Sequence, residues 1–152
     1  MHRLAQRYPE AATAIIKSDP RDQRTIAIDA ARCAVTHAGL KDATIAALLD
    51  GEAAGQTTNT AQRAVVGQIR DHLDEEQWNL AEAMESQTPD GEKSYLDAFM
   101  RARAAAAVWF AASPDPQEAA LEAVYEACNA VRDPRVIIHL VERHEAACTD
   151  GC

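Results

Sequence analysis

The dipeptide Asp-Pro occurs three times in the chain, at residues 19–20, 115–116 and 133–134. An aspartate at the N-cap of a helix accepts a hydrogen bond from a backbone N–H that has no partner inside the helix. Proline is favoured at the next position, because the N–H that it lacks would be unpaired there. At Asp115 the sequence also predicts a capping box, in which Glu118 reaches back to the cap. Each dipeptide therefore predicts the start of a helix.

Apolar residues recur at helical spacing in the first third of the chain. From Pro20 they predict a helix that ends at Gly39, where glycine supplies the left-handed stop. A shorter helix is expected from Asp42 to Gly51, followed by a loop over residues 52–60.

The middle of the chain continues the same pattern. A helix is expected over residues 65–73, and Asp74 with Gln77 resembles a capping pair that opens another. A turn at residues 88–91 should then precede a long helix over residues 95–110. Each of these connections is short.

Composition agrees with a helical fold. Alanine, the strongest helix former, is abundant, only 5% of the residues are aromatic, and no run alternates as a half-buried strand would. Short connections favour antiparallel neighbours. The prediction is an all-α fold with one domain over residues 1–152, built as a helical bundle or a short stack of antiparallel helical hairpins. About seven or eight helices are expected, with a frayed tail at residues 145–152.

The net charge of -9 argues against nucleic acid and anionic membranes as partners, because both require a basic surface. The longest uncharged apolar run covers residues 104–112, far short of the roughly 20 residues that cross a bilayer. The first residues also lack the apolar stretch of a secretory signal. We therefore expect a cytoplasmic protein, whose four cysteines are reduced.

Most of the excess negative charge lies in one segment. Residues 71–97 contain nine acidic residues and one base, Lys93. Such a run is commonly a solvated surface that maintains solubility. However, few bases are available nearby in sequence to pair with it, and it contains a tryptophan, a residue type enriched at protein interfaces. The alternative is a surface for a basic protein partner, made by Asp71, Asp74, Glu75, Glu76, Trp78, Glu82 and Glu85.

The C-terminal segment brings together residue types that bind metals. On a helix His144 and Cys148 would share one face, and Cys152 could fold back towards them as a third ligand. His139 would point in another direction. No Cys-x-x-Cys pair is present, so an ordinary exposed helix end explains the same residues. The sequence predicts no cofactor and leaves zinc at this tail as an alternative.

Other candidates for chemistry have simpler explanations. Cys33 and Cys128 lie on apolar helix faces, where free cysteine packs as a small apolar residue. His37 shares the face of Cys33, but no third group or oxyanion loop is apparent that would complete a nucleophilic site. Phosphate-binding glycine loops are absent as well. We expect that the protein is not an enzyme.

The run RTIAIDAARCAVTHAGL at residues 24–40, followed by DATIAALLDGE at 42–52, resembles alanine-rich, all-helical bacterial proteins of unknown function. Some families of this appearance are labelled as immunity proteins against toxins. The resemblance implies an immunity-type protein that binds a toxin, and the acidic segment that contains Trp78 makes a basic toxin the expected partner of this non-enzymatic protein. A helical regulator that binds a small molecule or zinc, and a structural homo-oligomer, are the alternatives.

Overall fold

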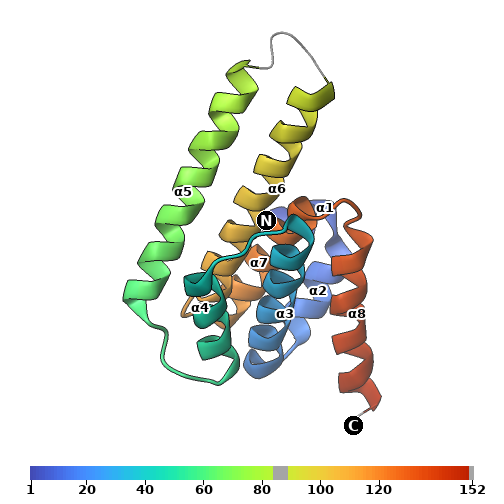
Figure 1. Cartoon of the computed structure of the whole chain (residues 1–152). Coiled ribbons are helices and arrows are strands. Elements are labelled where there is room, and N and C mark those ends of the chain that lie inside the picture. The colour runs from blue at the N-terminus through green and yellow to red at the C-terminus, as the bar shows by residue number, and fades with distance from the viewer. Residues whose placement is uncertain (84–88, 151–152) are drawn as a thin grey trace.

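A computed structural model describes residues 1–83 and 89–150, with the backbone alone for residues 148–150. Within these residues it contains eight helices and no strand, which confirms the all-α prediction (Figure 1). The helices are α1 (Arg3–Arg7), α2 (Pro9–Lys17), α3 (Pro20–Ala38), α4 (Ala43–Ala53), α5 (Thr60–Ala83), α6 (Pro89–Ala111), α7 (Pro116–Ala130) and α8 (Arg135–Asp150). No helix in the described ranges combines the length and apolarity needed to span a membrane.

Local capping signals place most helix ends correctly. The side chains of Asp19, Asp42 and Asp115 each accept a backbone hydrogen bond at the start of α3, α4 and α7. Asp133 does the same for Arg135 N at the start of α8, at 3.1 Å. Gly39 ends α3 in the left-handed conformation, with φ of 67°, as predicted.

Four local predictions are wrong. Helix α4 continues through Gly51 to Ala53, and the left-handed residue of the following turn is Gly55. Residues 89–91 belong to the first turn of α6 rather than to a loop. Glu118 does not complete a capping box; its carboxylate accepts a hydrogen bond from Ser113 Oγ at 2.7 Å. Helix α8 continues to Asp150, the last residue whose backbone is described, and the fraying expected at residues 145–152 stays a prediction.

The fourth wrong prediction is a helix break at Asp74, because α5 runs without interruption from Thr60 to Ala83. Asp74 forms an ion pair with Arg103 of α6 and does not cap a helix. A capping signal inside a strongly helical segment is overridden when the aspartate finds a partner in tertiary structure.

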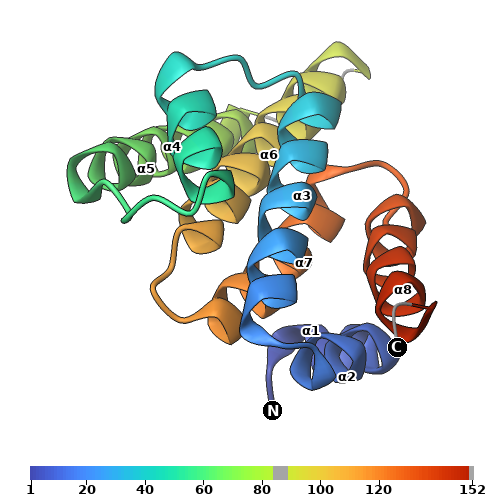
Figure 2. The ribbon, with the colours of Figure 1, turned by 90° about the horizontal axis from the view of Figure 1, so that it is seen from below.

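Alanine makes close packing of the central helices α3, α6 and α7 possible. Four consecutive residues of α6, Ala104 to Ala107, are buried, and they are followed by Val108. Ala104, Ala107 and Val108 belong to one continuous core with buried alanines of α3 and α7, whereas Ala105 belongs to a second cluster with Leu73 of α5. Small side chains at a helix contact allow the axes to approach closely. Figure 2 shows α3 lying across this centre, with α1, α2 and α8 to one side and α4 and α5 to the other.

The hairpin of α5 and α6 extends beyond this core (Figure 1). Its last buried cluster consists of Leu73, Ala102 and Ala105. Beyond it, none of the described residues 74–97 is buried. We call this part of the hairpin, residues 74–83 of α5 and 89–97 of α6, the arm.

Candidate protein-interaction surface

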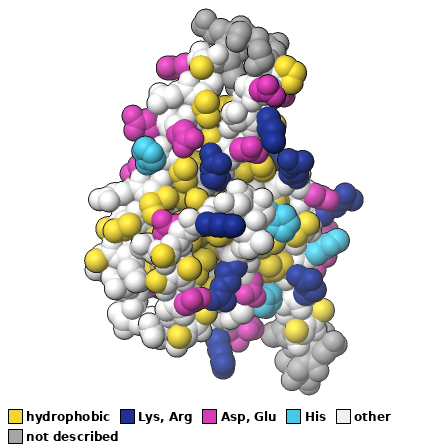
Figure 3. Space-filling model, in the orientation of Figure 1, with side chains coloured by type: hydrophobic (Ala, Val, Ile, Leu, Met, Phe, Trp, Pro, Cys, Tyr) yellow, Lys and Arg dark blue, Asp and Glu magenta, His cyan; other side chains and the backbone are white. Residues whose placement is uncertain are grey.

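Four of the predicted partner-binding residues lie on one line along α5. Asp71, Glu75, Trp78 and Glu82 follow each other at spacings of four, three and four, so they share one helix face. All four side chains are exposed, and Trp78 is 68% exposed. We call this line the acidic stripe. Figure 3 shows acidic side chains gathered over α5.

The stripe faces away from the rest of the molecule. Leu73 and Leu80 lie on the opposite side of α5, and Leu73 packs against alanines of α6. The amphipathic periodicity of this helix is visible in the sequence. It could therefore have distinguished the four stripe residues from the other acidic residues of the segment. Glu75 and Glu82 form no ion pair with any other described residue, so their charges are available to a partner.

The remaining predicted residues have other roles or lie outside the described part of the chain. Asp74 accepts a hydrogen bond from Arg103 Nη2 at 2.5 Å, and a Glu76 oxygen lies 3.5 Å from Arg101 Nη2. Asp71 of the stripe is paired with Arg70, at 3.0 Å. Glu85 lies outside the described residues.

These contacts correct the expectation that the acidic segment lacks compensating bases. The bases lie just outside the segment, in the preceding turn of α5 and in the second half of α6. Antiparallel packing of the two helices brings the α6 arginines within reach of Asp74 and Glu76, which lie on opposite sides of the line where α5 contacts α6. Asp74 and Glu76 therefore have structural partners within the molecule, whereas Glu75 and Glu82 of the stripe have no ion-pair partner among the described residues.

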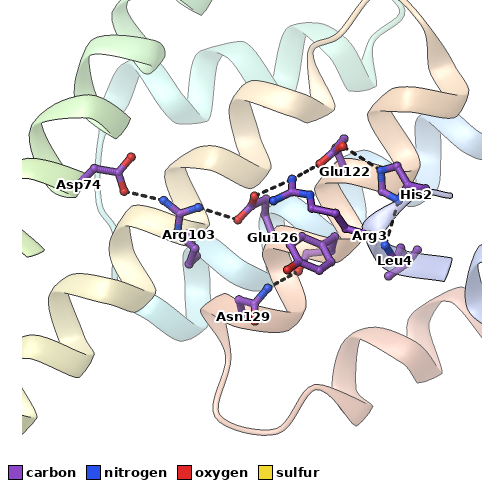
Figure 4. A network of polar contacts seen from close by, with 9 residues as sticks. His2, Arg3, Leu4, Asp74, Arg103, Glu122, Glu126 and Asn129 are labelled. Carbon is purple, nitrogen blue, oxygen red and sulfur yellow. Dashed lines mark hydrogen bonds and ion pairs between the residues drawn. The ribbon is translucent and has the colours of Figure 1, made fainter. Parts of the chain in front are cut away.

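An ion-pair network fixes the base of the arm (Figure 4). From Asp74 it passes through Arg103 to Glu126 of α7, whose side chain is only 3% exposed. Glu126 also accepts a hydrogen bond from Arg3 Nη2 at 3.2 Å, and Arg3 continues to Glu122. His2 Nε2 donates to Glu122 at 2.8 Å while its Nδ1 accepts from the backbone N–H of Leu4.

The network joins three consecutive helices, α5, α6 and α7, to the N-terminal helix α1. Glu126 accepts hydrogen bonds from two guanidinium groups, which offsets the cost of burying its carboxylate. Arg3 also stacks on Tyr125, with its guanidinium carbon 4.2 Å from the ring centre. Sequence reasoning missed Glu126 and Arg3, because they are separated by more than one hundred positions and neither belongs to a local pattern. Their arrangement is that of a structural brace rather than of free acids and bases.

Aromatic side chains border a hollow beside this brace. The hollow has a volume of about 410 Å³, and its lining includes Trp78, Phe99 and Tyr125 from three different helices. Tyr95 stacks on Phe99 with ring centres 6.4 Å apart, and Gln77 Nε2 donates to the Tyr95 hydroxyl at 3.3 Å. The stripe therefore adjoins a surface with exposed aromatic area.

The C-terminal candidates do not assemble into a metal centre within the described residues. His144 Nε2 lies 3.1 Å from Oδ2 of Asp29. Its polar partner is therefore a carboxylate on the core helix α3. No group of three or more His, Cys, Asp or Glu side chains suited to a metal occurs in the described part of the chain. The side chain of Cys148 and all of Cys152 lie outside it.

The thiols of Cys33 on α3 and Cys128 on α7 are not activated. Burial raises the pKa of Cys128 to about 12, and burial also raises the pKa of Cys33, against a smaller opposing effect of Arg143. Cys33 Sγ lies 3.5 Å from His37 Nδ1. That nitrogen also lies 2.9 Å from the Cys33 carbonyl oxygen, which can only accept, so Nδ1 is the donor there. His37 is thus poorly placed to take a proton from the thiol.

No protein-family model, curated protein or solved structure matches this chain. The resemblance to immunity proteins therefore stays a prediction.

Proposed function

We propose that this is a non-enzymatic interaction protein whose acidic stripe binds a basic protein. The observation that carries the proposal is the position of Trp78. It is 68% exposed in the middle of a line of carboxylates, on an arm that projects from the core. A large aromatic side chain exposed in this way is unfavourable in water and is of the type that dominates binding energy in interfaces.

The charges of the stripe also favour a basic partner. Unpaired carboxylates at Glu75 and Glu82 attract a cationic surface and accelerate its encounter with the protein. Asp71 adds a third acid to the same line. A projecting arm is accessible from several directions, whereas the short helices α1, α2 and α4 pack against the core.

A cationic toxin, neutralised by an immunity-type protein, is the most concrete partner of this class. The resemblance of residues 24–52 to such proteins and the charge of -9 favour it. We therefore propose a cytoplasmic protein whose partner is neither a nucleic acid nor a membrane. The raised pKa values of Cys33 and Cys128 support the non-enzymatic part, because a nucleophilic cysteine needs a lowered one.

Photo-cross-linking in cells of the native host tests the proposal. Trp78→benzoylphenylalanine places the reactive group in the stripe, and Ile16→benzoylphenylalanine places it at a 51% exposed position on α2 as a control. We expect a cross-link from position 78 to a protein of positive net charge, and none to that protein from position 16. Cross-linking of position 78 only to an acidic protein, to a second copy of this chain or to nothing would overturn the proposal.

A further inference from the structure

Helix α7 holds an arginine side chain of α1 against an aromatic ring. The guanidinium group of Arg3 lies over Tyr125, with its central carbon 4.2 Å from the ring centre. The same group forms ion pairs with Glu122 and Glu126, which lie three positions before and one position after the tyrosine (Figure 4). One helix therefore supplies both the aromatic face and the carboxylates that hold this guanidinium group.

Helix α5 repeats part of this arrangement on its exposed face. Glu75 precedes Trp78 by three positions, as Glu122 precedes Tyr125. Residues three apart on a helix are neighbours, so the spacing places a carboxylate beside an aromatic ring in both cases. The ring on α7 is occupied by Arg3, whereas no arginine–ring contact among the described residues involves Trp78.

The second carboxylate lies at a different position in the two arrangements. On α7 it directly follows the aromatic residue, whereas on α5 it is that of Glu82, one helical turn after Trp78 and on the same face. Glu75 and Glu82 are exposed and form no ion pair with another described residue. They lie on the side of Trp78 away from Asp74, so the ion pair of Asp74 with Arg103 does not neutralise them.

We infer that Trp78, Glu75 and Glu82 bind an arginine side chain of the basic partner, with its guanidinium group stacked on the indole ring. The inference rests on the proposed function and specifies the residue type that the stripe recognises. A guanidinium group is planar, so it can lie on an aromatic face while its N–H groups donate hydrogen bonds to carboxylates. The ammonium group of lysine is a compact, strongly hydrated charge that lacks this planar fork. The stripe therefore prefers arginine to lysine.

Two peptides of equal charge test the inference with the full-length protein. One is a short peptide of alternating glycine and arginine, and the other has lysine in place of every arginine. Attraction between charges alone gives the two peptides similar affinities. Because stacking favours arginine, we expect the arginine peptide to bind about fivefold more tightly at low salt, measured by fluorescence anisotropy of labelled peptide.

Two substitutions of Trp78 separate stacking on the ring from contact with an apolar side chain. Trp78→Leu keeps an apolar side chain without a ring, so the affinities for the two peptides should come within about twofold of each other. Trp78→Phe keeps a ring that attracts cations less strongly, and it should retain part of the preference. Trp78 is 68% exposed, so neither substitution should disturb the fold.

Removal of the two carboxylates tests their part in the site. Glu75→Gln/Glu82→Gln should weaken binding of the arginine peptide about tenfold, because both ion pairs with the peptide are lost. Glu10→Gln/Glu142→Gln is the matched control: it makes the same change at exposed positions on α2 and α8 and should weaken binding less than about twofold.

The outcomes distinguish the inference from the proposed function. A preference for arginine that is lost in Trp78→Leu, partly kept in Trp78→Phe and unchanged in Glu10→Gln/Glu142→Gln supports the inference. Equal affinity for the two peptides, or a preference that persists in Trp78→Leu, overturns it. Weaker binding in Glu75→Gln/Glu82→Gln would then still leave the stripe as a surface for a basic protein. Failure of both peptides to bind at low salt overturns the inference and the proposed function together.

Discussion

At the scale of single residues, Glu126 of α7 links α1 and α6 at the point where the arm joins the core. Its buried carboxylate receives hydrogen bonds from Arg3 of α1 and Arg103 of α6, which themselves reach Glu122 and Asp74. Breaking a fully buried ion pair from one side costs about 3–5 kcal/mol. Here both arginines keep some contact with water, so the cost should be smaller.

We predict that Glu126→Gln lowers the free energy of unfolding by about 2 kcal/mol, because two guanidinium groups lose their shared charged acceptor. Urea denaturation followed by circular dichroism measures this. Glu122→Gln is the control, since the Glu122 side chain is less buried and its loss should cost about 1 kcal/mol. Equal stability of Glu126→Gln and the unmodified protein would show that the network is not a brace.

At the scale of helices, end signals determine where most elements begin. Asp42 is the clearest case, because one carboxylate oxygen accepts from the backbone N–H groups of Thr44 and Ile45 at 2.8 Å and 3.0 Å. The helix that it starts places Ile45, Leu48 and Leu49 in the core. The stability of the cap therefore contributes to the stability of the whole fold.

We predict that Asp42→Ala destabilises the protein by about 1 kcal/mol, the usual effect of removing an N-cap side chain. The measurement is the midpoint and slope of urea unfolding. Asp50→Ala on the same helix is the control: its side chain is 74% exposed and its one ion pair among the described residues is with Arg32, so the change should stay within about 0.5 kcal/mol. A larger effect at Asp50 than at Asp42 would contradict the capping argument.

The difference between local caps and long-range contacts explains which elements could be predicted from the sequence. Asp19 and Gly39 act on backbone groups within a few residues, so their effect is visible in the sequence. Asp74 also resembles a cap, but Arg103 lies 29 positions away and becomes its neighbour only after α5 and α6 pair. Glu126 gives no local signal at all. Contacts of this kind depend on tertiary structure and are invisible to a reading of local patterns.

The candidate surface was predictable in part. The segment and its tryptophan follow from composition, and the spacing of Asp71, Glu75, Trp78 and Glu82 would have identified the stripe within it. The structural roles of Asp74 and Glu76 required the positions of Arg103 and Arg101.

At the scale of the whole molecule, both the distribution of charge and the shape distinguish the arm from the core. The core of α3, α6 and α7 has alanines at its helix contacts, and the arm that extends from it contains seven acidic residues and one base, in a chain whose net charge is -9. Residues 1–41, by contrast, contain seven bases and four acids. A basic partner should therefore be guided towards the arm rather than towards the core.

The most direct test of this account is the association rate of the partner captured by cross-linking, measured by stopped flow at low salt. Glu75→Lys/Glu82→Lys reverses two charges in the stripe, and Glu10→Lys/Glu142→Lys makes the same change in net charge at exposed positions on α2 and α8. We predict that the stripe pair slows association about tenfold and the control pair less than about twofold. Equal slowing by both pairs, or by neither, would contradict binding at the stripe.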